Sequence, residues 1–334
     1  MQRSSDQKVA YMKAVVLTEQ GVQVREVPDP EPGPNQVLVK VRACGLNRAD
    51  LIMAGGRMHG SAGGAGTVMG LEWSGEISAI GAQVKDLKVG DRVMCAGNGG
   101  FAEYAVTDWG RVQVIPANNM SFPQAATLPI ALTTMHNAVV TAGRLKAGES
   151  VLVQGASSGV GLMALQIAKQ KGAGLVIGTS TNVERRARLK EFGADLAVNS
   201  RDAGWVDEIL KATGGKGVDL TVDQLSGYVA NDNLRATAIL GRIVNVGRMG
   251  GFKGEFDFDL HALRRIDYIG VTFRTRSVDE VRDINKHVKE DLWPLLEAGQ
   301  LALPIDRTFP LAQAAEALAH MKANAHFGKI VLTT

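Results

Sequence analysis

The chain has 334 residues, of which 45% are apolar and 21% are charged, and this balance is typical of a folded globular protein rather than a disordered one. Its 37 basic and 34 acidic residues are mixed along the chain and give a formal net charge of +3, so no basic run predicts nucleic-acid binding. The length exceeds that of one ordinary core and predicts two domains.

The sequence also bears on the location of the protein and on the state of its cysteines. No stretch of about 18 uncharged apolar residues is present, and the N-terminal segment lacks the apolar core of a signal peptide. We therefore expect no membrane association and a cytoplasmic location. Cys44 and Cys95 lie far apart without a C-x-x-C pattern, which predicts reduced core thiols rather than a disulfide framework or a four-cysteine zinc site.

The first third of the chain predicts short β-strands, because apolar residues recur over brief segments and turn-forming residues cluster between them. These strands predict a partly closed β domain. Residues 53–70 are rich in glycine and form either a mobile loop beside a cleft or a solvated surface loop. The expected strands cover residues 12–18, 22–27, 37–46, 75–81 and 91–96.

From residue 121 the pattern changes to alternating helices and strands. Strands separated by helices of this length predict right-handed crossovers and a parallel sheet with helices on both faces, which is a doubly wound α/β domain. The expected helices cover residues 123–143, 160–172 and 184–194, and the expected strands cover residues 151–155, 174–180, 196–199, 218–224 and 241–247.

The last part of the chain, after residue 267, predicts a helix over 278–299, a helix over 312–323 and a closing strand over 328–334. The economical interpretation is that this tail returns to the first domain and completes it. We therefore expect a β domain of residues 1–125 and 267–334, a doubly wound domain of residues 126–266, and an active cleft between them.

Residues 155–161, GASSGVG, join an apolar strand to a helix. Backbone N–H groups and the positive end of the helix dipole then point to one position beyond the strand, which suits a pyrophosphate. Of the G-x-G-x-x-G fingerprint only Gly161 is retained, since Ala156 and Ser158 take the first two glycine positions. Taken alone, this turn could equally be a simple chain reversal.

The end of the next strand favours NADPH over NADH. NAD enzymes place an Asp or Glu about 20 residues beyond the turn, where it binds the adenosine ribose. Here Ser180 stands at that place, and Arg185 and Arg186 begin the following helix. Hydroxyl and guanidinium groups bind a 2′-phosphate that an acid would repel. The alternative is that the two arginines only form a solvated helix face.

Two later strand ends, at residues 223–226 and 246–250, predict the other half of the cofactor site. In open parallel sheets ligands bind beyond the carboxyl ends of the strands, so we expect the nicotinamide there. Glycines in the second turn allow the backbone to come close to a ligand.

Several of these segments together resemble the medium-chain dehydrogenase/reductases over nearly the whole chain, from about residue 12 to the end. NRADL, GLE and TFRTR are most similar to the quinone oxidoreductase branch. The segments that carry the resemblance are ACGLNRADL (43–51), GLEWSG (70–75), GASSGVG (155–161), NVGRMGG (245–251) and HFGKIVL (326–332).

The resemblance implies that the three zinc ligands of the zinc alcohol dehydrogenases correspond in this sequence to Asn47, Leu71 and Ile130. None of these is the expected Cys, His or Cys, and leucine and isoleucine have no lone pair for a metal. We therefore predict no metal at this site. Without a Lewis acid, alcohol dehydrogenation is a poor candidate, and an acceptor that is already electron-poor is required.

The resemblance also implies roles for single residues. Asn47 and Thr134 would lie beside the nicotinamide as catalytic residues. A tyrosine often found after NRADL is replaced by Met58, and the adjacent His59 either serves as proton donor or is only an exposed loop residue. Asp50 is expected to start a helix or orient the cleft. The implied cofactor contacts are Ala156, Ser157, Ser158, Gly159, Val160 and Gly161 at the pyrophosphate, Ser180 and Arg185 at the 2′-phosphate, and Asp223, Leu225, Val246, Gly247, Phe273, Arg274 and Phe327 toward the nicotinamide.

These features predict an NADPH-dependent, zinc-independent quinone oxidoreductase that transfers hydride to quinones or similar conjugated carbonyls. One alternative is a reductase of enones or enoyl thioesters. Another is an NADPH-binding protein of low turnover that acts as a scaffold. The expected partners are the small-molecule acceptor and, by family resemblance, a second copy of the chain in a homodimer.

Overall fold

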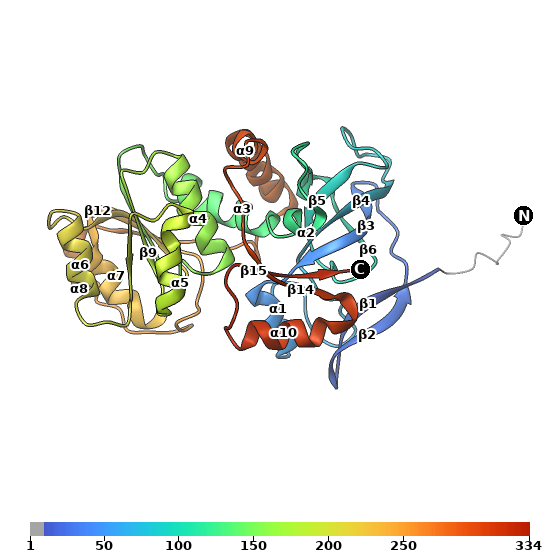
Figure 1. Ribbon diagram of the computed structural model, residues 1–334, viewed down its shortest axis with the longest axis horizontal. Helices are drawn as coiled ribbons and strands as arrows, with labels where there is room; N and C mark the ends of the chain where they lie inside the picture. The colour runs from blue at the N-terminus through green and yellow to red at the C-terminus, as the bar shows by residue number, and fades with distance from the viewer. Residues whose placement is uncertain (1–9) are drawn as a thin grey trace, which may run out of the picture. The chain divides into compact units, whose positions relative to one another are not determined.

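The computed structural model describes residues 10–334. The N-terminal segment in which we looked for a signal peptide therefore lies largely outside the described residues. The chain divides into two compact units (Figure 1). The first unit runs to Pro129 and also includes Ser277–Arg282 and Ile305–Thr334. The second unit comprises Ile130–Arg276 and Asp283–Pro304.

The first unit is built on mostly antiparallel β-structure around a core that contains Trp73, Phe101 and Leu332, all fully buried. β1 (Tyr11–Thr18) pairs with β2 (Gly21–Pro28) as a hairpin. A seven-stranded sheet has the order β14-β15-β3-β4-β5-β7, and β6 pairs with β3. Its strands are β3 (Gln36–Gly45), β4 (Glu72–Ile80), β5 (Arg92–Ala96), β6 (Tyr104–Asp108), β7 (Val112–Val114), β14 (Ile305–Pro310) and β15 (Lys329–Thr333); its helices are α1 (Arg48–Ala54), α2 (Phe122–Ala125) and α10 (Ala314–Lys322).

The second unit contains a six-stranded, wholly parallel sheet with the order β10-β9-β8-β11-β12-β13. Val151, Leu152 and Val153 of the central strand are fully buried, as expected where helices cover both faces of a sheet. This order confirms the predicted doubly wound fold. The strands are β8 (Ser150–Val153), β9 (Leu175–Thr179), β10 (Leu196–Val198), β11 (Val218–Asp223), β12 (Thr237–Asn245) and β13 (Asp267–Gly270).

The helices of the second unit follow the predicted pattern with two local differences. The helix expected over 123–143 is broken before Pro129, because proline cannot donate a backbone hydrogen bond, and it ends in a π-helical turn at Asn137–Thr141. The helix expected over 184–194 continues after α5 as a 3₁₀ turn. The helices are α3 (Pro129–His136), α4 (Gly159–Gln170), α5 (Val183–Arg188), α6 (Trp205–Ala212), α7 (Ala230–Ala236), α8 (Phe258–Arg264) and α9 (Val278–Glu297).

The boundary expected at residue 267 differs from the structure. β13 continues the parallel sheet, with Arg242 opposite Asp267 and Asn245 opposite Gly270, so residues 267–276 belong to the second unit. Residues 283–304, which include most of α9, also belong there. The prediction followed chain order, whereas in the structure β13 pairs with backbone groups of β12 that would otherwise stand unpaired at the edge of the sheet.

One exposed position carries backbone strain. Leu240 in β12 has a φ of 63°, a conformation that costs a non-glycine residue about 1–2 kcal/mol, and its side chain is 63% exposed. Leu240→Gly should therefore raise the free energy of unfolding by about 0.5–1 kcal/mol in urea denaturation. The matched control is Ile239→Gly, next to it and 56% exposed, which lies outside the left-handed region and should lose stability. Equal losses of unfolding free energy in the two variants would contradict backbone strain at Leu240.

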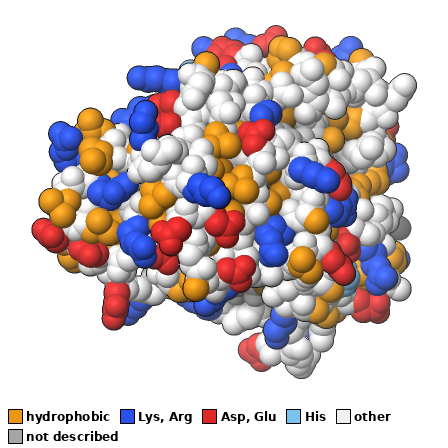
Figure 2. Space-filling model, turned by 60° about the vertical axis from the view of Figure 1, so that its left-hand side comes forward, with side chains coloured by type: hydrophobic (Ala, Val, Ile, Leu, Met, Phe, Trp, Pro, Cys, Tyr) orange, Lys and Arg blue, Asp and Glu red, His pale blue; other side chains and the backbone are white. Residues whose placement is uncertain are grey.

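The described surface fits the composition. The face in Figure 2 mixes basic, acidic and apolar side chains without a field of one charge. No helix in residues 10–334 combines the length and apolar character that crossing a bilayer requires.

Candidate functional site

The turn from β8 to α4 has the geometry of an anion site. Ser158 caps the helix by accepting a hydrogen bond from Gly161 N at 3.1 Å, and the first N–H groups of α4 have no intrahelical acceptor. A Cβ atom at Gly161 would lie 2.6 Å from the carbonyl oxygen of Gly155 and 2.7 Å from Ala156 Cα. Glycine is therefore required for close packing of helix on turn, which is the role of the third fingerprint glycine.

A buried polar network holds this turn in place and was not predicted. Thr179 Oγ1 accepts from Gly155 N at 2.9 Å and donates to Gln154 Oε1 at 2.8 Å. Gln154 Nε2 in turn donates to Asn233 Oδ1 at 2.6 Å. Gln154, Thr179 and Asn233 are all fully buried, so the network fixes the strand ends beneath the predicted cofactor rather than touching it.

Hydroxyl and guanidinium groups gather at the end of β9. Ser180 Oγ lies 3.0 Å from Ser157 Oγ, and Arg186 donates from Nη1 to the Ser180 carbonyl oxygen at 2.9 Å. Arg185 is half-buried on the same helix. The sequence prediction assigned Arg185 to the 2′-phosphate, while the contact to the end of the strand belongs to Arg186.

The turns after β11 and β12 are tied together by side chains. Asp223 accepts from Leu225 N and Ser226 N, both at 2.9 Å, and it is fully buried. Burial is the largest cause that raises the pKa of Asp223, and those two N–H donors partly offset it. Asp223 therefore shapes the turn, and its contact with the cofactor stays a prediction. Leu225 is half-buried.

Ser226 completes this clip. Its φ is 56°, which is strained for a non-glycine residue, and its Oγ donates to the Gly247 carbonyl oxygen at 2.7 Å. Asn245 Nδ2 donates to the same Oγ at 2.5 Å. Strain held by two hydrogen bonds at the carboxyl edge of the sheet is typical of a ligand-binding turn.

The remaining predicted residues of the second unit are partly accessible. Val246 and Gly247 directly follow β12 and are half-buried, and Phe273 is half-buried shortly after β13. Arg274 is exposed and donates from Nε to Thr272 Oγ1 at 3.2 Å. Thr134 is half-buried in α3. The structure thus gathers the turns after β8, β9, β11 and β12 at one edge of the sheet, as predicted from their strand ends. The turn after β13 lies at the same edge, although the sequence predicted this segment in the other domain.

Asn47 in the first unit belongs to a buried ionic cluster. It precedes α1 and donates from Nδ2 to Glu72 Oε1 at 2.9 Å. Lys329 Nζ donates to Asn47 Oδ1 at 3.0 Å, to Glu72 Oε1 at 2.5 Å and to the Leu46 carbonyl oxygen at 2.8 Å. Glu72 is fully buried and Lys329 is 4% exposed. Three acceptors satisfy all three ammonium protons, which a buried lysine requires.

These donors do not fit zinc. Asn47 faces an ammonium ion, Leu71 offers no lone pair, and the positive charge of Lys329 opposes a second cation beside it. Among the described residues no three His, Cys, Asp or Glu side chains are grouped as metal ligands. The cluster therefore contains one fixed positive charge, that of the Lys329 ammonium group.

Asp50, on the first turn of α1, is fully buried beside this cluster and accepts from Asn47 N at 2.7 Å. Its other oxygen has no hydrogen-bond partner in the described part of the chain. Burial raises the pKa of Asp50 from 3.8 to about 7, against the opposing effects of the Asn47 N–H and the charge of Lys329; Glu72 adds to the rise. The sequence prediction of a helix-start carboxylate is confirmed, because Asp50 bonds the residue that begins the helix.

This pKa predicts a pH dependence of stability. Between pH 3.8 and about 7, Asp50 is ionised in the unfolded chain but stays protonated in the folded chain. The free energy of unfolding therefore falls as the pH rises through this range, and the fall ends near pH 7. The difference in unfolding free energy between the natural protein and Asp50→Asn should fall by about 1 kcal/mol per pH unit across this window. Denaturation at several pH values measures it, and a constant difference would contradict the prediction.

His59 and Phe327 also lie in the first unit. His59 is half-buried and pairs with Ala62 through two backbone hydrogen bonds inside the glycine-rich segment. The later part of that segment is fastened to β1, since Val68 bridges Val16. Phe327 is buried, and its N–H donates to Asp306 Oδ1 at 3.2 Å.

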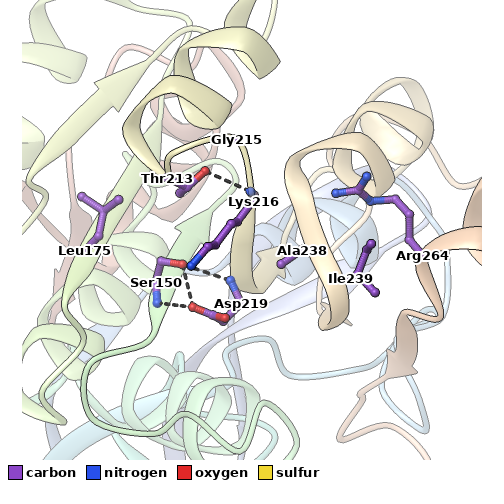
Figure 3. Close-up of a pocket in the computed structure, with 10 residues that line it drawn as sticks. Ser150, Leu175, Thr213, Gly215, Lys216, Asp219, Ala238, Ile239 and Arg264 are labelled. Atoms are coloured by element: carbon purple, nitrogen blue, oxygen red, sulfur yellow. Dashed lines mark hydrogen bonds between the residues drawn. The ribbon is translucent and has the colours of Figure 1, made fainter.

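A separate concavity of about 520 Å³ lies at the opposite, amino-terminal edge of the parallel sheet (Figure 3). Ser150 and Leu175 begin β8 and β9 there. Asp219 accepts from both the N–H and the hydroxyl of Ser150 at 2.8 Å, which ties β8 to β11. Since ligands of such sheets bind beyond the carboxyl ends, this concavity is not the predicted cofactor site.

Comparison with known proteins agrees with this architecture. Residues 33–117 match the family described as alcohol dehydrogenase GroES-like domain, and residues 159–290 match the family described as zinc-binding dehydrogenase. The crystal structure of CurK enoyl reductase superimposes with a TM-score of 0.85 at 28% identity, covering 96% of this chain and 99% of that one.

Two curated proteins are similar to this chain in sequence. A mycocerosic acid synthase-like polyketide synthase from Mycobacterium tuberculosis is 30% identical over 90% of this chain, but the chain spans only 14% of that protein. The quinone oxidoreductase of Sus scrofa is 32% identical over 294 residues, which cover 87% of each chain. The protein therefore belongs to the quinone oxidoreductase family of the medium-chain dehydrogenase/reductases.

Proposed function

We propose that the protein is an NADPH-dependent, zinc-independent reductase of quinones and similar conjugated carbonyls. The observation that carries this proposal is the buried Lys329 ammonium, bonded to Asn47 and Glu72 where a zinc alcohol dehydrogenase would need metal ligands. A site without a Lewis acid suits an acceptor whose conjugation already stabilises the negative charge.

The cofactor preference rests on the end of β9. Ser157, Ser180 and Arg186 supply two hydroxyls and a guanidinium group, and no acidic residue replaces Ser180. This set suits a 2′-phosphate, whereas a ribose diol is normally bound by a carboxylate. The turn at residues 155–161 would hold the pyrophosphate, and the turns after β11 and β12 would face the nicotinamide.

Bound NADPH supplies a hydride, with its two electrons, to one carbon of the conjugated acceptor. The acceptor oxygen then bears a negative charge, and Asn47 is the donor that we assign to it through Nδ2. Thr134 would contact the nicotinamide side. A proton from water or from His59 converts the oxyanion to the hydroxyl product.

A second candidate is an enoyl reductase. It is favoured by the likeness to CurK enoyl reductase and to a polyketide synthase, and the same zinc-free site would serve because an enoyl thioester is also a conjugated carbonyl. A third is an NADPH-binding scaffold of low turnover.

Parallel assays separate these candidates. The loss of NADPH absorbance is followed with 1,4-benzoquinone, an enone and a crotonyl thioester, each also with NADH. We expect the highest kcat/KM for NADPH with the quinone. A preference for the thioester would favour the enoyl reductase, and tight NADPH binding without turnover of any acceptor would favour the scaffold.

His59→Ala tests the proton donor. If His59 protonates the product, kcat should fall by about 10²-fold while the affinity for NADPH stays unchanged, because general acids contribute about 10²–10⁴-fold. Stopped-flow turnover and fluorescence titration of NADPH measure the two quantities. An unchanged kcat would remove His59 from the mechanism and leave water as the proton source.

We also propose that the protein forms a homodimer through β13 and α8. β13 is one of the two edge strands of the parallel sheet in the described residues, and nearby apolar side chains are exposed: Phe258 by 75% and Leu263 by 68%. Sedimentation should give twice the monomer mass, and Leu263→Glu should shift the protein toward monomer. A monomer in the natural protein at micromolar concentration would contradict this.

A further inference from the structure

The buried cluster of Lys329, Glu72 and Asn47 is assembled by the pairing of three strands. Glu72 is the first residue of β4, Lys329 is the first residue of β15, and Gly45 ends β3 between them, paired in register with Glu72 on one side and Val331 on the other. Sheet pairing therefore brings together two charges that are 257 positions apart. A Cβ atom at Gly45 would lie 2.6 Å from Glu72 Oε1, so this glycine makes the space for the carboxylate.

The two charges determine how the Asn47 amide is turned. Lys329 has only protons to offer, so the atom that faces it must be Oδ1. Glu72 Oε1 accepts the Lys329 proton and a second bond from Asn47, so the atom that faces it must be Nδ2. Both neighbours thus demand the same orientation, and the usual ambiguity of an asparagine amide does not arise here.

One proton of the Asn47 amide is only weakly engaged within the protein and could be donated to a ligand. The first Nδ2 proton is engaged by Glu72 at 2.9 Å, while the other Nδ2 contact, to the Gly45 carbonyl oxygen, is long at 3.4 Å. Lys329, Glu72 and Asp50 are buried, whereas Asn47 is partly exposed, so Asn47 is the member of the cluster that reaches solvent.

We propose that Lys329 is a positioning residue that acts through Asn47: the buried ammonium, together with Glu72, orients the amide so that its second Nδ2 proton is directed to the oxygen of the bound acceptor. This inference rests on the proposed function, because it takes Asn47 as the donor to the acceptor oxyanion. A preorganised donor needs no rearrangement when charge develops, which is why its orientation matters for kcat more than for substrate affinity.

The test removes both charges together, because Lys329→Met alone would leave the buried Glu72 carboxylate without the Lys329 charge that faces it. In the double variant Lys329→Met/Glu72→Gln the amide loses its orienting ion pair. We expect kcat to fall about 10-fold to 10²-fold, with the KM for NADPH unchanged. Lys322→Met, on the exposed face of α10, is the matched control and should retain the natural kcat.

A background of Asn47→Ala separates positioning from a general structural role. If Lys329 and Glu72 act through Asn47, adding their substitutions to Asn47→Ala should change kcat by less than about twofold. If kcat instead falls by the same factor as in the natural background, the proposal is overturned, since the charges then act independently of the amide.

A readout without turnover keeps this inference distinct from the proposed function. In the natural protein the side-chain NH₂ of Asn47 should give two resolved NMR signals, one of them protected from exchange by its bond to Glu72. In the double variant the protection should be lost. If no acceptor is reduced, the proposed function fails, but retained protection in the double variant would by itself overturn the orienting role.

Discussion

Arg186→Glu is expected to weaken NADPH binding by about 10²–10³-fold and to change NADH binding by less than about threefold. Arg186 donates to the Ser180 carbonyl oxygen at 2.9 Å, which holds its guanidinium beside the hydroxyls of Ser157 and Ser180. A charge-assisted bond to a phosphate contributes about 1.5–3 kcal/mol, and the new carboxylate adds repulsion, so a total of about 3–4 kcal/mol is lost for NADPH only.

The same assay ranks the two arginines. Arg185→Glu should also impair NADPH selectively if its side chain reaches the phosphate, by less than Arg186→Glu. Arg188→Glu on the same helix is the control, since Arg188 forms an exposed pair with Glu191. Dissociation constants from fluorescence titration of both cofactors decide the matter. Equal losses for NADPH and NADH in Arg186→Glu would remove the 2′-phosphate from this position.

The fold was largely predictable because its signals are local. Runs such as Val151–Val153 followed by a helix-period pattern predict parallel strands with crossovers, and the sheet order confirms them. The break of the helix before Pro129 was also encoded locally by proline, and the prediction of one continuous helix overlooked it. The assignment of β13 was wrong because pairing with an edge strand leaves no mark in the sequence of a four-residue segment.

The candidate site was predictable only in part. Residues 155–161, 180 and 246–247 follow the ends of predicted strands and are rich in glycine and serine. In a parallel sheet the carboxyl ends of the strands lie at one edge, so the sequence was enough to place these residues together. The pairing of Lys329 with Glu72 depends on the register of three antiparallel strands, and each residue alone has the pattern of an ordinary strand end. A charged residue at the start of a strand is usually solvated, and only the fold shows that these two are buried.

Gly161→Ala should lower the free energy of unfolding by about 1–3 kcal/mol and weaken NADPH binding at least 10²-fold. In an ordinary helix interior this substitution stabilises by about 1 kcal/mol, so a loss reverses the usual sign. The reason is that the new methyl group would meet the Gly155 carbonyl oxygen at 2.6 Å and Ala156 Cα at 2.7 Å. These are backbone atoms of the turn, which a change of rotamer cannot move.

Relief of that contact must displace the turn against α4, and the amide groups that would bind the pyrophosphate move with it. The control is Gly270→Ala in β13, where a Cβ atom meets nothing within 4 Å, and its stability and cofactor affinity should be close to those of the natural protein. Urea denaturation and NADPH titration measure both effects. If Gly161→Ala instead gained stability and retained NADPH, the helix would not be held against the turn, and residues 155–161 would lose their assignment as the pyrophosphate site.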